Sequence, residues 1–191
     1  RKYDIRYFFY IGGNDSMDTV AKLTEYLKTS DWDMRVIGVP KTIDNDLAGT
    51  DHTPGYGSAA KYIAATLSEI IRDCAVYTVK AVTIVEIMGR DAGWLTAAAG
   101  LMRLNGMAAP DYIYLPEVPF SFDAFLEDVT AALEKHPNVV IAVSEGVRDE
   151  NGRYAGEGAQ SGAADVFGHK YLSGIGKYLE GLVRSEVGCK V

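Results

Sequence analysis

The chain has 191 residues, of which 48% are hydrophobic and 24% charged, and its formal net charge is −7. This length allows a sizeable core in one or two domains, and the acidic balance argues against nucleic-acid binding, which needs a basic face. No apolar run is long enough to span a bilayer, so we expect no membrane partner and a cytoplasmic protein. Cys74 and Cys189 are far apart, which favours free thiols over a disulfide or a zinc site.

Strand-like and helical patterns alternate along the chain. The sequence predicts strands near 5–11, 33–39, 80–88, 112–115 and 138–144, with a last short strand at the end. Predicted helices lie at 16–29, 56–73, 92–105, 121–136 and 168–186. Such alternation predicts an α/β fold with mostly parallel sheets and helices on both faces. The segment 145–168 lacks periodicity, and we interpret its polar stretch, Arg148 to Arg153, as a surface loop without function.

The loop after the second predicted strand is the most informative segment. It contains Pro40, Lys41, Thr42, Asp44 and Asp46. Because proline cannot continue a central ladder, the charged cluster should lie at the carboxyl end of a strand, where open α/β sheets bind ligands. A lysine, a threonine and two carboxylates in one loop are suited to handling phosphate, metal and a proton. The alternative is ordinary turn chemistry, since Asx side chains cap their own backbone.

Two other strand patterns end in glycine. The first breaks into paired glycines and then a serine that we expect to cap a helix: Gly12, Gly13 and Ser16. Glycines there let the backbone approach a phosphate, which the helix N-terminus favours, although a simple tight turn is the alternative. The other strand pattern ends in Met88, Gly89 and Arg90. An acidic protein that binds anionic substrates needs its basic side chains close together at the binding site. Lys41 and Arg90 both follow predicted strands, so their side chains can lie close together at the strand ends.

Taken in order, the motifs Gly-Gly-x-x-Ser, Pro-Lys-Thr-Ile-Asp-x-Asp and Met-Gly-Arg-x-x-Gly-Trp resemble those of the phosphofructokinase family. The segment Pro116-Glu117-Val118-Pro119-Phe120 is similar to the sugar-phosphate side of that family. The resemblance runs the whole length of the chain and implies doubly wound, Rossmann-like lobes. It divides the chain into residues 1–54, the tail of the phosphoryl-donor lobe, and residues 55–191, an incomplete fructose 6-phosphate lobe.

The resemblance also implies an activity. The expected enzyme moves a phosphoryl group from diphosphate to the 1-hydroxyl of fructose 6-phosphate, giving fructose 1,6-bisphosphate and phosphate. By the same resemblance, Asp44 is the general base, and Lys41 and Arg90 stabilise the transferring group. The implied sugar-phosphate ligands are Thr42, Met88, Gly89, Arg90 and Glu117. The implied donor ligands are Gly12, Gly13, Asp15, Ser16 and Lys41. The implied ligands of Mg²⁺ are Asp46, Asn14 and Asp15.

Three positions bear on the donor and on catalysis. ATP-using relatives have glycine at the positions equivalent to Asp15 and usually Lys41, so these two residues favour diphosphate. Asn14 stands where relatives usually have aspartate, and it brings no charge. The ATP-dependent enzyme is the alternative; a non-catalytic regulatory subunit is a further one, which the presence of Asp44 disfavours. We also expect a homo-oligomer, a dimer or a tetramer, and an excerpt that lacks parts of both pockets and does not turn over alone.

Overall fold

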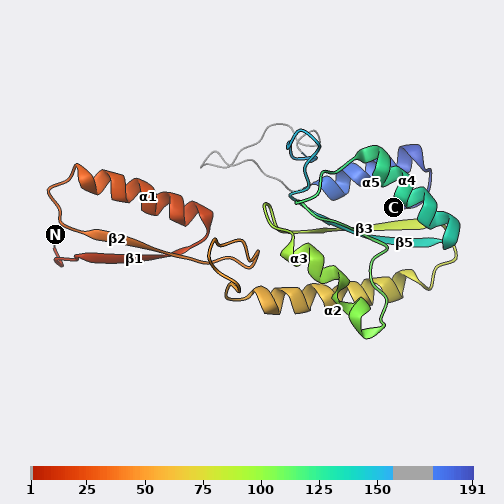
Figure 1. Cartoon of the computed structure of the whole chain (residues 1–191), viewed down its shortest axis with the longest axis horizontal. Helices are drawn as coiled ribbons and strands as arrows, with labels where there is room; N and C mark the ends of the chain where they lie inside the picture. The colour runs from red at the N-terminus through yellow and green to blue at the C-terminus, as the bar shows by residue number, and fades with distance from the viewer. Residues whose placement is uncertain (1, 157–173) are drawn as a thin grey trace.

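The computed structural model describes residues 2–156 and 174–191, which form two parallel sheets with helices packed on them (Figure 1). The smaller sheet pairs two strands, β1 (Tyr7–Gly12) and β2 (Arg35–Pro40). The larger sheet has the order β3-β5-β4, with β3 (Ala81–Ile87), β4 (Tyr112–Tyr114) and β5 (Asn138–Ser144). Every pair of neighbouring strands is parallel, which confirms the predicted α/β class.

The described residues form the α-helices α1 (Asn14–Lys28), α2 (Tyr56–Cys74), α3 (Trp94–Ala97), α4 (Phe122–Lys135) and α5 (Ile175–Glu186). All except α1 cover the larger sheet, on both of its faces. Figure 1 shows α2 and α3 against one face of the β3-β5-β4 sheet, and α4 and α5 against the other. The sheet is therefore doubly wound, as predicted. On the smaller sheet α1 lies along one face.

The core of the larger unit lies between the central strand β5 and the apolar side of the helices packed on it. In β5, every residue after the first is buried, as expected for a central parallel strand with helices on both sides. Helix α4 buries one stripe, made of Phe125, Val129, Ala132 and Leu133, toward this sheet. The Ser121 hydroxyl caps the helix by accepting a bond from the Ala124 amide.

The predicted helices differ from the observed ones in three places. The helix expected over 92–105 is α-helical only in α3 and continues as a 3-10 helix, Ala98–Asn105. Gly100 lies in this stretch, where it weakens the α-helix and allows close packing on Ile113. Ser16 is inside α1 rather than its cap, because the helix already begins at Asn14. The last helix starts at Ile175, and the rest of its predicted range, 168–173, lies outside the described residues.

Strand ends also differ slightly from the prediction. Pro40 is the last residue of β2, opposite Gly12, so the proline closes the strand instead of following it. At the end of the chain, Lys190 makes an isolated parallel bridge to Ala81, where a short strand was predicted. Within the described residues, no helix combines the length and the apolar character that a bilayer crossing requires.

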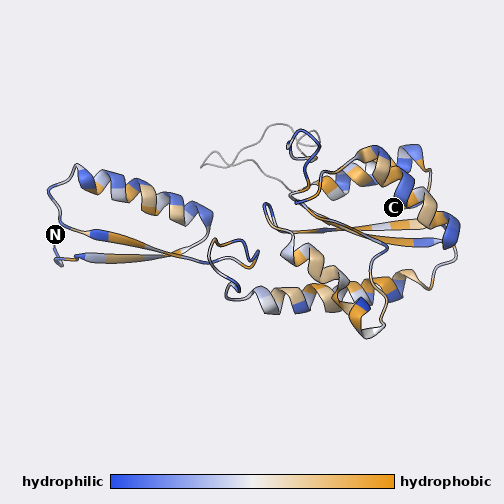
Figure 2. Ribbon diagram, viewed as in Figure 1, coloured by the Kyte–Doolittle hydropathy of each residue, from blue (hydrophilic) through white to orange (hydrophobic). Residues whose placement is uncertain are grey.

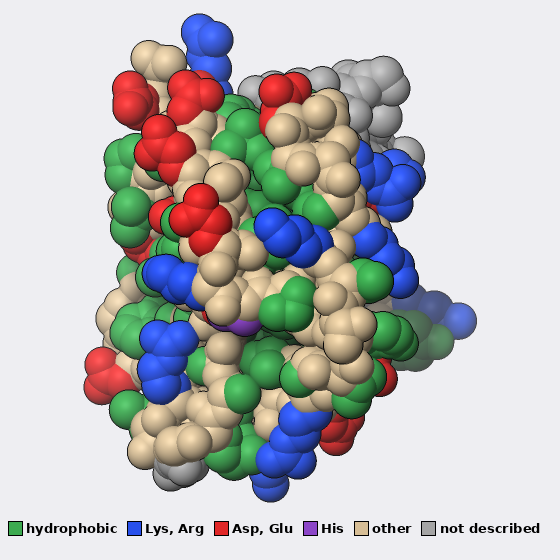
Figure 3. Space-filling model, turned by 90° about the vertical axis from the view of Figure 1, so that its right-hand side faces the viewer, with side chains coloured by type: hydrophobic (Ala, Val, Ile, Leu, Met, Phe, Trp, Pro, Cys, Tyr) green, Lys and Arg blue, Asp and Glu red, His purple; other side chains and the backbone are tan. Residues whose placement is uncertain are grey.

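The two units differ in how much they bury. No residue of α1 is buried, and Tyr7, Phe9 and Ile11 of β1 are 62%, 61% and 69% exposed. In Figure 2, the strands of both sheets carry hydrophobic stretches, coloured orange. The face of the larger unit that points away from the smaller one carries Lys and Arg groups interspersed with acidic and apolar side chains (Figure 3). That face shows no continuous basic surface of the kind that nucleic acids require.

Candidate active site

The carboxyl end of the smaller sheet brings a glycine turn, a helix start and a lysine together. The Lys41 amide donates to the Gly12 carbonyl over 2.9 Å, which fixes the loop after β2 beside the turn after β1. A Cβ atom at Gly12 would overlap the Ser16 hydroxyl, and one at Gly13 would lie 3.8 Å from Lys41 Nζ. Helix α1 begins directly after Gly13, so its first backbone amides lie at the same turn. Backbone donors, a helix N-terminus and a cation in one place form an anion-binding arrangement.

The loop that follows Lys41 is held by the side chain of Asn45. This residue is 7% exposed and has a left-handed backbone, with φ of 60°. Its Oδ1 accepts from the Thr53 amide over 2.8 Å, and its Nδ2 donates to the Asp51 carbonyl over 3.3 Å. The Asp44 amide donates to Thr42 Oγ1 over 3.0 Å. The local turn is thus made by Thr42, whereas Asn45 bonds residues six and eight positions later instead of its own turn; together they hold the loop that carries Asp44 and Asp46.

Asp44 is the most perturbed acid of this region. Burial raises its pKa above the ordinary aspartate value, and the negative charges of Asp46 and Glu145 raise it further. The Thr42 hydrogen bond and the positive charge of Arg90 act in the opposite direction. Among the described residues, none offers a hydrogen bond to the buried Oδ1 atom of Asp44. A half-buried carboxyl with one unused oxygen beside an arginine is suited to accept a proton.

Hydrogen bonds to the Gly89 backbone connect the carboxyl ends of β3 and β5. The Gly89 amide donates to Glu145 Oε1 over 3.1 Å, and the Ser144 hydroxyl donates to the Gly89 carbonyl over 2.7 Å. The next turn packs on Gly146, where a Cβ atom would overlap the Arg90 carbonyl. Sequence reasoning missed Ser144, Glu145 and Gly146. Ser144 ends a predicted strand and the other two follow it, so the rule that ligands bind at strand ends would have pointed to them.

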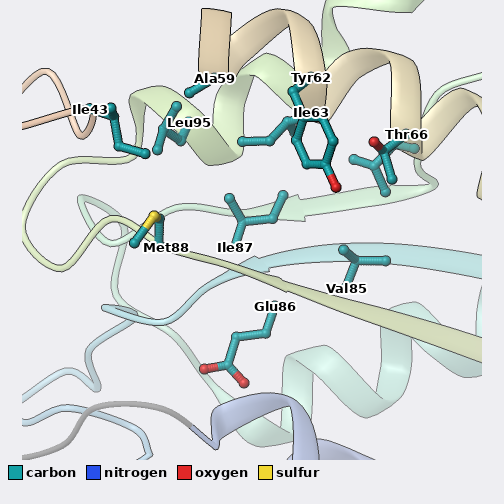
Figure 4. A pocket seen from close by; sticks show the side chains of 11 residues that line it. Ile43, Ala59, Tyr62, Ile63, Thr66, Val85, Glu86, Ile87, Met88 and Leu95 are labelled. Atoms are coloured by element: carbon teal, nitrogen blue, oxygen red, sulfur yellow. The ribbon is translucent and has the colours of Figure 1, made fainter. Parts of the chain in front are cut away.

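The other predicted sugar ligands lie on the neighbouring turns. Glu117 accepts from the Gly93 amide over 2.7 Å, so one of its oxygens already supports the turn before α3. Met88 is 51% exposed and borders an apolar hollow of about 370 Å³ between α2 and β3 (Figure 4). Figure 4 also shows Ile43, from the loop after β2, at this hollow. Glu86 points to the opposite side of β3.

The predicted residues therefore fall into two groups joined by one loop. Lys41 lies at the glycine turn with the first residues of α1, whereas Asp44 interacts with the charges of Arg90 and Glu145 in the larger unit. The predicted metal ligands are the exposed Asp46 and the first residues of α1, Asn14 and Asp15. No three His, Cys, Asp or Glu side chains of the described residues are close enough to hold a metal alone.

The donor types at the loop nevertheless fit magnesium. Mg²⁺ prefers oxygen ligands, usually takes only one or two carboxylates, and completes its shell with water and substrate phosphates. Asp44 has an unpartnered buried oxygen, and the neighbouring negative charge of Asp46 raises its pKa. A cation beside this pair of carboxylates would relieve their mutual repulsion.

Comparisons with known proteins agree with this architecture. The phosphofructokinase family profile matches residues 1–191. A pyrophosphate--fructose 6-phosphate 1-phosphotransferase of Xanthomonas campestris is 46% identical over 100% of this chain and 46% of its own length. The crystal structure of a pyrophosphate-dependent phosphofructokinase from Nitrosospira multiformis aligns with a TM-score of 0.72 and 35% identity, over 99% of this chain and 44% of that one. The chain thus spans about half the length of these relatives. It belongs to the phosphofructokinase family.

Proposed function

We propose that this chain carries the catalytic loop of a diphosphate-dependent 6-phosphofructokinase. The reaction transfers a phosphoryl group from diphosphate to the 1-hydroxyl of fructose 6-phosphate. The observation that carries the proposal is the half-buried Asp44, whose pKa is raised by burial and which lies within the electrostatic reach of Arg90 from the other unit. Phosphoryl transfer needs mainly positioning and charge stabilisation, with one group to take the proton of the attacking hydroxyl.

In this mechanism Asp44 accepts the proton of the sugar 1-hydroxyl. Burial, together with the charges of Asp46 and Glu145, raises its pKa above the ordinary aspartate value, which makes it a stronger base than an exposed aspartate. Thr42 Oγ1 accepts a hydrogen bond from the Asp44 amide, and the Thr42 side chain also stabilises the ionised Asp44 carboxylate, so Thr42 orients the base. Arg90 stabilises the charge that spreads over the oxygens of the transferring group. Glu145 adds a polar group next to Gly89 at the sugar side.

The donor half of the site is proposed to bind diphosphate. The glycine turn, with Gly12, Gly13 and Ser16, and the N-terminus of α1 supply backbone donors, and Lys41 supplies the cation. Asp15, in the first turn of α1, would face the α-phosphate of a nucleotide. Two like charges about 4 Å apart repel by about 4 kcal/mol at an effective dielectric constant near 20. This penalty corresponds to roughly a thousandfold discrimination against ATP, and diphosphate avoids it because it is shorter.

Magnesium is part of the proposal. Asp46, with Asn14 or Asp15, would hold the ion directly or through water, and an amide oxygen at Asn14 would coordinate without adding charge. When bound, the ion neutralises charge on the diphosphate. The chain's own groups keep their separate tasks, since Lys41 binds the donor and Asp44 takes the proton.

The remaining parts of the proposal rest on the family resemblance. Residues 1–54 would belong to the donor lobe and residues 55–191 to the sugar-phosphate lobe, with Met88, Gly89 and Glu117 on the sugar side. The smaller sheet and the loop after it fall in the first range, and the larger sheet falls in the second. A homo-oligomer, a dimer or a tetramer, and a cytoplasmic location complete the assignment.

The direct test is Asp44→Ser in the full-length protein. Removing a general base typically costs about 10²–10⁴ in rate, so kcat should fall by that factor while the KM for fructose 6-phosphate changes only a few-fold. Asp51→Ser is the matched control, because this exposed residue of the same loop contributes its backbone carbonyl and not its side chain. A nearly normal kcat for Asp44→Ser in steady-state assays would show that another group takes the proton.

A further inference from the structure

The guanidinium of Arg148, on the segment after β5, makes three hydrogen bonds and one ring contact. Its Nη2 donates over 2.6 Å both to Asp91 Oδ1 and to the Tyr154 hydroxyl, and its Nη1 donates to the Gly152 carbonyl over 3.3 Å. The Cζ atom lies 3.9 Å from the centroid of the Tyr154 ring. An isolated antiparallel bridge joins Arg148 and Tyr154, so the segment between them folds back on itself. Arg148 therefore does not have the freedom expected of a solvated surface side chain.

Its partner, Asp91, is the residue that follows Arg90. The inner side of this turn is already held by Ser144 and Glu145, which bond to both polar groups of the Gly89 backbone. Arg148 adds a bond to Asp91, so Gly89 and Asp91, on either side of Arg90, are both bound to residues at or just after the end of β5. The charges of Arg148 and Arg90 both lower the pKa of Tyr154, although burial and Asp91 raise it overall. Arg90 therefore lies within electrostatic range of this cluster.

The ion pair between Arg148 and Asp91 is too exposed to contribute much to the stability of the fold. The side chains of Arg148 and Asp91 are 33% and 54% exposed, and pairs in such positions contribute little to the free energy of unfolding. What the arrangement does fix is direction. A guanidinium bound on several sides holds a planar fork in one geometry, which a lysine cannot reproduce.

We propose that Arg148 is a positioning residue for phosphoryl transfer: by binding Asp91 it fixes the turn that aims Arg90 at the transferring group. This inference rests on the proposed function, since Arg90 has its role there. Arg148 touches no reacting atom. For Arg148, this positioning role replaces the interpretation of the segment from Arg148 to Arg153 as a loop without function. Small displacements of a catalytic group lower the rate steeply, which is why a residue outside the reacting centre matters.

The test compares Arg148→Ala with Arg153→Ala in the full-length protein. Arg153 is exposed in the same segment, and its amide, which any residue retains, makes its hydrogen bond to Asp149. We expect Arg148→Ala to lower kcat with diphosphate on the order of tenfold to a hundredfold. The KM for fructose 6-phosphate and the thermal midpoint should stay close to those of the Arg153→Ala control. Arg148→Lys should recover only part of the rate, because it restores the charge and not the fork.

A double-mutant cycle identifies the partner. If Arg148 acts through Asp91, Asp91→Ala should lower kcat by a similar factor and the double variant should lose little more. Equal kcat values for Arg148→Ala and Arg153→Ala in an enzyme that uses diphosphate would overturn the positioning role, as would fully multiplicative losses in the cycle. A loss of thermal stability that accounts for the lost activity would overturn it too. A wild-type protein without diphosphate-dependent activity would instead refute the proposed function, and this inference with it.

Discussion

The two sheets follow the same sequence pattern but stand in different environments. In the larger unit, β5 is buried on both faces and Ile141 is fully inaccessible, whereas Phe9 of β1 is 61% exposed. Both sheets place their chemistry at carboxyl ends: the glycine turn and Lys41 on one, Gly89 and Arg90 on the other. In this 191-residue chain, which spans about half the length of its relatives, the apolar strand pattern predicts the element and its chemical end but not how much of the strand the chain itself covers.

The loop after β2 connects these unequal units at the site. Asn45 fixes the loop through Thr53, and Asp44 is influenced by charges that belong to the larger unit, Arg90 and Glu145. The loop after β2 thus has a defined geometry of its own, whereas the larger unit adds a buried core. Substitutions in the two units should have correspondingly different effects.

The largest difference is expected for core substitutions. Phe125→Ala, at a fully buried position of α4, should lower the free energy of unfolding by about 3–5 kcal/mol because it leaves a cavity. Phe9→Ala in the exposed strand β1 of the same 191-residue chain should change it by no more than about 0.5 kcal/mol. Urea unfolding followed by circular dichroism measures both. Equal losses for the two variants would contradict the difference in burial.

A smaller effect is expected where backbone packs on backbone at the site. Gly146→Ala would place a methyl group against the Arg90 carbonyl, and the required shift should cost about 1–3 kcal/mol in stability. The control is Gly181→Ala in α5, where no atom lies near the added methyl group. That change should stabilise the chain by about 0.5–1 kcal/mol, since alanine is the better helix former. Thermal unfolding of the two variants should therefore shift in opposite directions.

The smallest effect is the pH dependence contributed by Asp44. Its native pKa is raised, so above the unfolded value, about 4, the native state binds more protons than the unfolded state. The free energy of unfolding should then fall as pH rises through this window, and Asp44→Asn should remove that slope. Urea unfolding of both proteins at a series of pH values gives the comparison. If the free energy of unfolding fell more steeply with pH in Asp44→Asn than in the wild type, the assigned direction of the pKa shift would be contradicted.

Local patterns in the sequence were sufficient for much of this architecture. Strand-like runs predicted the five strands of the described residues, while the sixth, at the end of the chain, formed only an isolated bridge. The carboxyl-end rule placed Lys41, Asp44 and Arg90 on the loops of the candidate site. The misplaced cap at Ser16 has a local cause, since paired glycines allow the helix to begin two residues earlier. Helix boundaries depend on such details, which periodicity does not contain.

Contacts between distant segments were not predictable in the same way. Glu145 is an unremarkable acid in the sequence and reaches Gly89 only because β5 lies next to β3 in the sheet. The segment with Arg148 has no periodicity, which indicates a surface loop, and its bond to Asp91 is not visible in the sequence because Asp91 follows another strand. Strand order decides these pairs, and a hydrophobic pattern in one chain does not specify strand order.

The measurement that tests the central claim most directly is the donor preference of the full-length protein. With magnesium and saturating fructose 6-phosphate, kcat/KM is determined for diphosphate and for ATP. Asp15 and Lys41 predict that diphosphate is preferred, on the order of a thousandfold from charge repulsion alone. Replacing both residues by glycine should lower activity with diphosphate and raise it with ATP. A wild-type kcat/KM for ATP equal to or above that for diphosphate would contradict the account.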